Sequence, residues 1–173
     1  MGRLGVDVGG VVIEPTSRDD DTSFFGPNYL RTPPVPGVFE GLAALVPLFD
    51  ETHVVSTCGE RTERHTRAWL DHHDFYTRTG IAPERLHFCR TRPAKAPVAA
   101  RLGLTHFVDD RLEVLGYLDT VGHRYLFRPY PPELAAHAAH LPGVHRVESW
   151  SELVAALTPP PPPGRGGPAG DAG

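Results

Sequence analysis

Short apolar runs and stretches of helical periodicity alternate along most of the chain. Each apolar run is only a few residues long and is bounded by glycine or polar residues, which is typical of strands buried on both faces. The first run, LGVDVGGVV, carries a carboxylate at Asp7, where we expect the strand to stop because an unpaired carboxylate is costly inside a core. The runs predict five strands, at residues 4–12, 53–57, 86–89, 105–110 and 124–127.

Between these runs, apolar residues recur every three or four positions, which predicts amphipathic helices. Pro47 should kink or end the helix that starts near Val38, and Ser149 with Glu152 has the spacing of a capping box before the last helix. Further helices are expected at residues 60–73, 94–102, 112–118, 132–140 and 150–157. This alternation predicts an α/β fold, a Rossmann-like parallel five-stranded sheet with helices on both faces.

Two segments lack the alternating pattern of the α/β domain, which we expect to span residues 1–157. Residues 14–37 are rich in proline, glycine and acidic residues but also carry Phe24 and Phe25, so we expect a small flap over the strand ends in place of a large cap. Residues 158–173 contain nothing that could enter a core and are expected to be disordered. Their proline run fits a polyproline II ligand for a partner protein, but an inert tail is the expectation.

Composition and charge narrow the function classes. The chain has 173 residues, 40% of them hydrophobic, which is enough for a substantial core, and its formal net charge is -4. Lysine and arginine are scattered, so we expect no nucleic-acid-binding patch, and no apolar run approaches the roughly 18 residues of a membrane span. Cys58 and Cys89 each end an apolar run, which suits reduced, buried thiols. We therefore expect a cytoplasmic protein.

Polar side chains stand at the predicted carboxyl ends of the strands. Because these ends meet at one edge of a parallel sheet, a single crevice could collect them. Carboxylates that meet there repel one another unless a hard cation neutralises them, and oxygen ligands suit Mg²⁺. A hydroxyl and an ammonium nearby suit an anionic phosphoryl group, so the set predicts metal-assisted phosphoryl transfer to a carboxylate. The residues are Asp7, Ser56 with Thr57, Lys95 at the start of a helix, and Asp109 with Asp110.

The order and spacing of these residues resemble the haloacid dehalogenase-like hydrolase superfamily, and the flap resembles that of its small-cap branch. The resemblance implies that Asp7 is a nucleophile that becomes an aspartyl-phosphate. It implies that Ser56, or Thr57 one position further, hydrogen-bonds the phosphoryl oxygens of a small phosphorylated substrate, with Gly10 also contributing to substrate binding. Lys95 would hold the nucleophile and the phosphate together.

The same resemblance implies a Mg²⁺ site. Its ligands would be Asp7, the backbone carbonyl of Gly9, Asp109 and Asp110, acting directly or through water, with Glu113 further out. Gly9 needs no side chain for this role, because a backbone carbonyl can bind the ion.

Gly9 nevertheless departs from the family pattern. Phosphatases of the superfamily usually carry an Asp two residues after the nucleophile, which protonates the leaving group and then activates water. General acid–base catalysis contributes roughly 10²–10⁴-fold, and Gly9 leaves that role vacant. The alternatives are a Mg²⁺-dependent phosphatase, a catalytically impaired relative that binds a ligand or a protein, and an enzyme whose Asp7 attacks a substrate other than a phosphate. Glu14 and the acidic run at residues 19–21 are the nearest other acids.

A cysteine phosphatase is a competing hypothesis, because Cys58 and Arg64 have the Cys-x5-Arg spacing of that class. Glu60 and Glu63 lie inside this loop and would repel a phosphate. The hypothesis also leaves the acidic residues at the strand ends unexplained, so we disfavour it.

Overall fold

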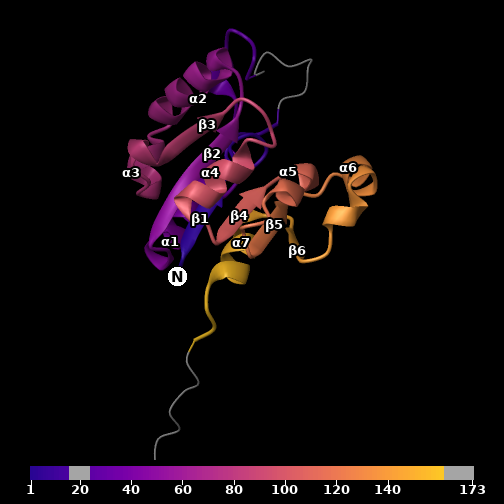
Figure 1. The fold of residues 1–173 in the computed structure, drawn as a ribbon. Helices are drawn as coiled ribbons and strands as arrows, with labels where there is room; N and C mark the ends of the chain where they lie inside the picture. The colour runs from indigo at the N-terminus through magenta and orange to yellow at the C-terminus, as the bar shows by residue number, and fades with distance from the viewer. Residues whose placement is uncertain (16–23, 162–173) are drawn as a thin grey trace, which may run out of the picture.

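A computed structural model describes residues 1–15 and 24–161 of the chain. The acidic run at residues 19–21 and most of the proline- and glycine-rich tail lie outside these residues. The described chain contains a six-stranded sheet in which all neighbouring strands are parallel, in the order β3-β2-β1-β4-β5-β6 (Figure 1). The strands are β1 (Arg3–Val6), β2 (Glu51–Thr57), β3 (Leu86–Cys89), β4 (His106–Asp109), β5 (His123–Phe127) and β6 (Val144–Val147). The predicted Rossmann-like α/β fold is confirmed.

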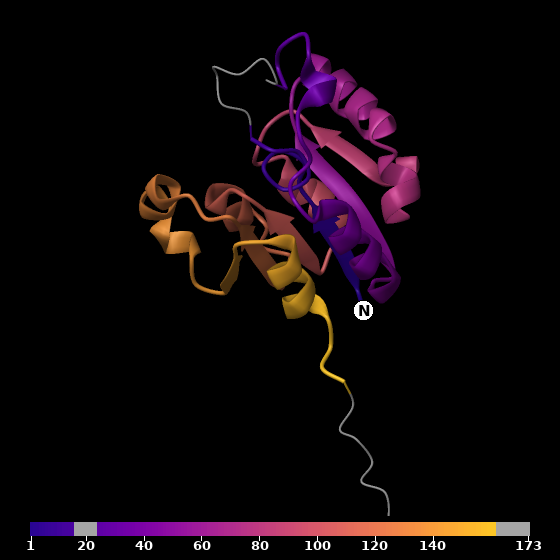
Figure 2. The same cartoon turned by 180° about the vertical axis from the view of Figure 1, so that it is seen from behind.

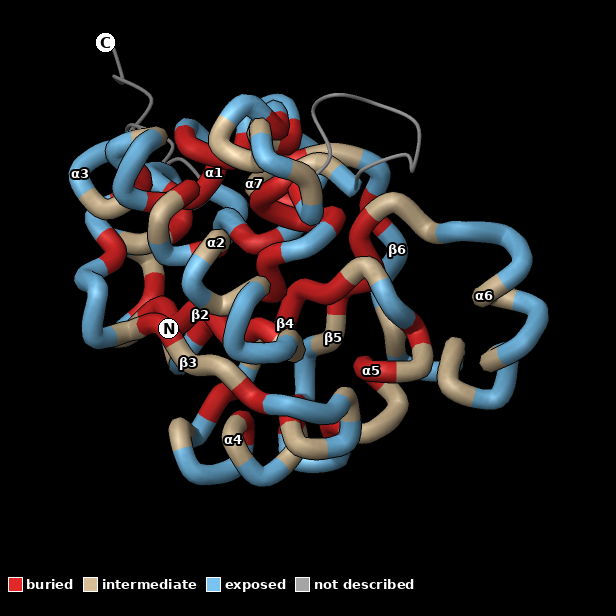
Figure 3. The backbone as a smooth tube through the Cα atoms, turned by 90° about the horizontal axis from the view of Figure 1, so that it is seen from above, coloured by how far each residue is buried: buried red, intermediate tan, exposed pale blue. Residues whose placement is uncertain are grey.

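Helices cover both faces of the sheet. One face carries α1 (Val38–Leu45), α2 (Glu60–His72), α3 (Phe75–Thr79) and α7 (Trp150–Leu157) (Figure 2). The buried side chains of these four helices belong to one core cluster. The other face carries α4 (Lys95–Leu102), α5 (Leu112–Tyr117) and α6 (Pro131–Ala136). Short 3₁₀ helices lie at Tyr29–Arg31, Val46–Leu48, Pro83–Arg85 and Ala138–His140. Buried positions gather along the central strands, whereas α6 has none (Figure 3).

Two predicted helix boundaries follow the expected chemistry. Helix α1 ends at Leu45, and Pro47 sits in the 3₁₀ turn that follows it. Helix α7 is capped by Ser149, whose Oγ accepts a hydrogen bond from the backbone N–H of Glu152. No helix in the two described ranges is both long and apolar enough to cross a bilayer.

The sequence-based strand count was wrong by one. Strand β6 is an edge strand in which Val147 is the buried residue and His145 and Arg146 are exposed, so it lacks the continuous apolar run that marks a buried strand. The first strand is also shorter than its apolar run. It ends at Val6, after which the chain turns back on itself: the carbonyl of Val8 accepts hydrogen bonds from the N–H groups of Val12 and Ile13, at 2.8 and 3.1 Å. Residues 11–13 are apolar because this turn is buried.

The strand order places a topological switch point between β1 and β4. From β1 the chain continues to β2 and β3 on one side of β1, and it then returns to form β4, β5 and β6 on the other side. In sheets of this kind ligands bind outside the carboxyl ends of the strands at such a point. Val6 pairs with Val108, and the N–H of Asp7 donates to the carbonyl of Val108 at 3.0 Å. Asp7 and Asp109 therefore occupy equivalent positions on adjacent strands.

Tryptophans fix the backbone at two points, one just before and one within the segment, residues 14–37, that was expected to form a flap. Trp150 on α7 donates its Nε1–H to the carbonyl of Val11 at 2.9 Å. Trp69 on α2 donates in the same way to the carbonyl of Thr32, also at 2.9 Å. Both indoles are buried, so each hydrogen bond satisfies a carbonyl that water does not reach.

Candidate active site

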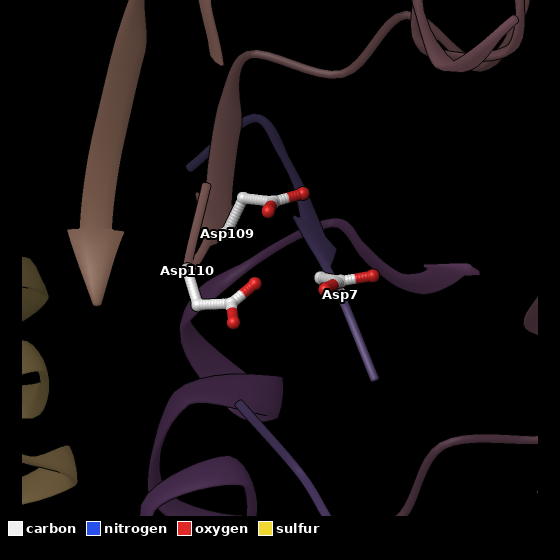
Figure 4. A group of neighbouring side chains, drawn as sticks. All are labelled: Asp7, Asp109 and Asp110. Carbon is white, nitrogen blue, oxygen red and sulfur yellow. The ribbon is translucent and has the colours of Figure 1, made fainter. Parts of the chain in front are cut away.

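Three carboxylates meet at the switch point. Asp7 directly follows β1, Asp109 ends β4 and Asp110 follows it, and one oxygen of each lies within 4.8 Å of the others (Figure 4). Asp109 is completely buried, Asp7 is 8% exposed, and Asp110 is half-buried. The parallel register therefore brings together the acidic residues that the sequence placed at strand ends.

Lys95 joins two of these carboxylates. Its Nζ donates hydrogen bonds to Oδ1 of Asp7 and to Oδ2 of Asp109, each at 2.7 Å, from the first residue of α4. Burial alone would lower the pKa of this ammonium, but the charges of Asp109 and Asp7 outweigh burial and raise it, so Lys95 is charged. The N–H of Arg111 donates to the remaining oxygen of Asp109 at 2.9 Å.

One ammonium does not neutralise three carboxylates. Burial raises the pKa of Asp110 to about 8, with the charges of Asp7 and Asp109 adding to the shift. Burial also raises the pKa of Asp7 to about 6, reinforced by Asp109 and opposed by Lys95. This excess of negative charge, carried by oxygen donors alone, fits a hard divalent cation such as Mg²⁺.

The residues at the end of β2 lie beside this cluster. Ser56 is buried and lines a cavity of about 330 Å³, whereas Thr57 lines both that cavity and a smaller one of about 160 Å³. Because side chains alternate along a strand, the two hydroxyl residues point to opposite faces of the sheet. Thr57 is the one that shares the smaller cavity with Asp7 and Lys95, and its Oγ1 lies 3.2 Å from Sγ of Cys89.

Sequence reasoning missed two arginines in the smaller cavity. Arg92 and Arg111 line it together with Lys95, which gives an acidic site a cationic rim. Arg92 is paired with Glu113 at 2.7 Å, whereas Arg111 makes no ion pair with any residue that the structure describes. Arg111 directly follows Asp110, and this adjacency to the strand end is the signal that could have revealed it.

The two glycines that follow Asp7 have different surroundings. Gly10 has a φ of 75°, and a Cβ there would collide with the Asp110 carboxylate, so this position requires glycine. Gly9 is exposed at the cavity wall, and a Cβ there would meet nothing within 4 Å. The space that a second Asp would occupy is therefore open.

Glu14 and Glu113, both named from the sequence, are already paired. Glu14 lines the larger cavity, and both of its carboxylate oxygens lie 3.0 Å from Nη1 of Arg128. Glu113 accepts hydrogen bonds from Arg92 at 2.7 Å and from Tyr117 at 3.0 Å, and it lines neither cavity. Of the two, Glu14 has the access that acid–base chemistry needs.

The geometry does not favour a cysteine nucleophile. Burial raises the pKa of the Cys58 thiol, and the charge of Glu63 adds to the shift, so Cys58 carries less thiolate than a free cysteine. Cys58 lines the larger cavity, but Arg64 lines neither cavity. The cysteine and the arginine of the Cys-x5-Arg spacing therefore do not face one phosphate-sized site.

No protein-family model matches the sequence, and no curated protein matches it either. Among solved structures, the fold is similar to the crystal structure of a conserved haloacid dehalogenase-like protein of unknown function from Agrobacterium tumefaciens. The TM-score is 0.57 at 14% sequence identity, and the match covers 90% of this chain and 97% of the other. The chain therefore has the fold of a haloacid dehalogenase-like protein.

Proposed function

We propose that this protein is a Mg²⁺-dependent hydrolase of the haloacid dehalogenase type that acts as a phosphatase on a small phosphorylated metabolite. The observation that best supports the proposal is the buried Lys95 bridge between Asp7 and Asp109, with Asp110 beside it and a cavity in front. A structural ion pair has no need of a third carboxylate with a raised pKa.

Asp7 is the nucleophile in this proposal. Its carboxylate attacks the phosphorus of the substrate, a new O–P bond forms, and the bond from phosphorus to the leaving oxygen breaks. Water then attacks the phosphorus of the aspartyl-phosphate, which releases inorganic phosphate and regenerates the Asp7 carboxylate. Lys95 holds Asp7 in place and, with the hydroxyl of Thr57 or Ser56, donates hydrogen bonds to the phosphoryl oxygens.

Asp7, Asp109, Asp110 and the carbonyl of Gly9 would hold the metal ion. When bound, Mg²⁺ supplies positive charge that lowers the repulsion between the nucleophile and the phosphoryl group. Arg111 lines both cavities and adds a second positive charge next to the transferring group.

Gly9 supports a second candidate function. Without a carboxylate at this position, the proton for the leaving oxygen must come from solvent or from another acid. Among the described residues outside the acidic cluster, Glu14 is the acid that lines the cavity. Losing the acid costs roughly 10²–10⁴-fold in rate. The second candidate is therefore a catalytically impaired relative that binds a phosphorylated ligand or a partner protein.

A panel of phosphorylated metabolites assayed with Mg²⁺ tests both candidates. Asp7→Asn should abolish any hydrolysis while circular dichroism and thermal unfolding show an intact fold, because the amide is nearly isosteric with the carboxylate. Cys58→Ser should leave the rate unchanged. The reverse pattern would overturn the proposal in favour of cysteine chemistry. Binding of phosphorylated compounds without turnover would favour the second candidate.

A further inference from the structure

The larger cavity has a polar floor and an apolar wall. The floor is formed by the strand ends with Asp7, Ser56 and Asp110. The apolar wall includes Phe24 and Phe25. Phe25 is 65% exposed, so its ring is accessible to a ligand that enters the cavity.

The aromatic wall is attached to a rigid element. The Phe24 ring packs edge-to-face against Phe25 at 6.0 Å and against Tyr29 at 6.1 Å. Tyr29 in turn stacks on His65 of α2 at 3.9 Å with the planes 2° apart, and the Nδ1 of His65 lies 3.4 Å from the carbonyl of Phe24. The wall is therefore held by α2 and is in place before a ligand arrives.

The charges of the cavity restrict what can lie against this wall. Arg111 is the basic residue among the described lining residues, and it sits with Asp7 and Asp110 at the phosphoryl end. Glu14 on the wall side is paired with Arg128. Among the described lining residues, a second anionic group on the substrate would face the carboxylates of Asp7, Asp110 and Glu14, and the one unpaired cation, Arg111, lies at the phosphoryl end. The part of the substrate beyond the phosphate should therefore be neutral.

We infer, building on the proposed function, that the site takes phosphate monoesters whose leaving group carries a neutral aromatic ring, which packs against Phe25 and Phe24. Offset or edge-to-face packing of such a ring strengthens binding by roughly twofold to twelvefold per aromatic contact. A simple aryl or arylalkyl group and the base of a nucleoside monophosphate share this chemistry. Phe25 is then a specificity-determining residue.

Binding of non-hydrolysable phosphonates tests the inference without relying on turnover. Isothermal titration calorimetry of the full chain with Mg²⁺ should show phenylphosphonate binding at least about tenfold more tightly than methylphosphonate. Phe25→Ala should remove most of this ratio, and the exposed position of Phe25 makes the variant compatible with folding. Tyr130→Ala is the matched control, because Tyr130 is 64% exposed and does not line the cavity, and it should preserve the ratio.

Three results would each overturn the inference. The first is equal affinity for phenylphosphonate and methylphosphonate, and the second is no measurable binding of phenylphosphonate. The third is an affinity ratio that persists in Phe25→Ala. Hydrolysis rates separate its failure from that of the proposed function. Asp7-dependent turnover with no preference for phenyl phosphate over glycerol phosphate would reject only the aromatic substrate. A Phe25-dependent binding preference without turnover of any ester would reject only the phosphatase. A thymidine 5′-phosphate arm, compared with phenyl phosphate, separates a nucleobase from a simple aryl group.

Discussion

Gly9 and Gly10 are adjacent, but the structure requires glycine at only one of the two positions. Gly10 needs a positive φ and has no room for a side chain, because Asp110 lies against it. Gly9 has an ordinary φ and open space around its Cα. Neither backbone geometry nor lack of space therefore requires glycine at position 9. The absence of a carboxylate there has no steric cause.

Gly9→Asp should raise the turnover of an activated phosphate ester by at least about tenfold, a modest part of the usual acid–base contribution. The reason is that the new carboxylate would enter open space on the cavity wall, close enough to Asp7 to serve the leaving oxygen. Steady-state kinetics with Mg²⁺ measures the gain. Gly9→Asn is the control, since it fills the same space without a titratable group.

A folded Gly9→Asp protein that binds Mg²⁺ but gains no activity would contradict this account. Proton transfer would then not be the limiting part, and Glu14, which already lines the cavity, would be the residue to replace next.

At the scale of strands, the carboxyl ends and the amino ends of the parallel strands carry different kinds of residue. The acidic cluster lies at the carboxyl ends of the strands, whereas β4 and β5 each begin with a histidine at their amino ends. His106 and His123 are paired in register, and their rings stack at 4.3 Å. Burial lowers the pKa of His106 to about 4, and a charge on His123 and the chain's amino terminus act in the same direction.

His106 should make the fold less stable as the solution is acidified. An unfolded chain takes up a proton at this histidine near its usual pKa of 6.5, whereas the folded chain does so only near 4. Between these values the unfolded state binds more protons, so the free energy of unfolding falls as the pH falls. Thermal unfolding followed from neutral pH to about pH 5 should show a smaller loss for His106→Gln than for the parent.

His72→Gln, which changes an exposed histidine of α2, should keep the pH dependence of the parent protein. If His106→Gln and the parent lose the same stability on acidification, His106 accepts its proton in the folded state and the burial argument is wrong.

Strands with mostly apolar sequences could be predicted, whereas an edge strand with two adjacent exposed polar residues could not. The run at residues 86–89 predicted β3 to the residue, because this strand is bounded by polar segments. Strand β6 was missed since its exposed edge allows His145 and Arg146. The first strand was predicted too long, because a buried turn and a buried strand demand the same apolar residues at positions 11–13.

At the scale of the whole molecule, Mg²⁺ should stabilise the fold. The cluster of Asp7, Asp109 and Asp110 has more negative charge than Lys95 can balance, so an ion that binds the folded state raises the melting temperature by mass action. Differential scanning fluorimetry with added Mg²⁺ and then with a chelator measures the shift. Asp109→Asn combined with Asp110→Asn should remove it.

Asp71→Asn combined with Asp119→Asn is the matched control, since both aspartates are exposed and lie outside the cluster, and it should retain the Mg²⁺ shift. A shift that persists when Asp109 and Asp110 are both replaced would place the ion elsewhere on the molecule.

The position of the acidic cluster followed from the sequence because parallel strands align their ends, whatever the details of packing. Asp7 and Asp109 meet for that reason, and Lys95 reaches both of them from the first residue of α4. The cavity wall could not be predicted in the same way. Phe25 reaches the site through the packing of Phe24 on α2, a contact between segments some 40 positions apart that no local pattern encodes.

The chain contains two tryptophans, and each indole N–H is hydrogen-bonded to the backbone of a segment that also contributes residues to the cavity lining. Val11, the partner of Trp150, lies just beyond the two glycines, and Thr32, the partner of Trp69, lies in the segment that follows Phe24 and Phe25. Any ligand that shifts either backbone segment changes the polarity around a buried indole, and so changes its fluorescence emission. Replacing one tryptophan by phenylalanine leaves a single tryptophan. Its intrinsic fluorescence can then be used to follow ligand binding without an attached dye.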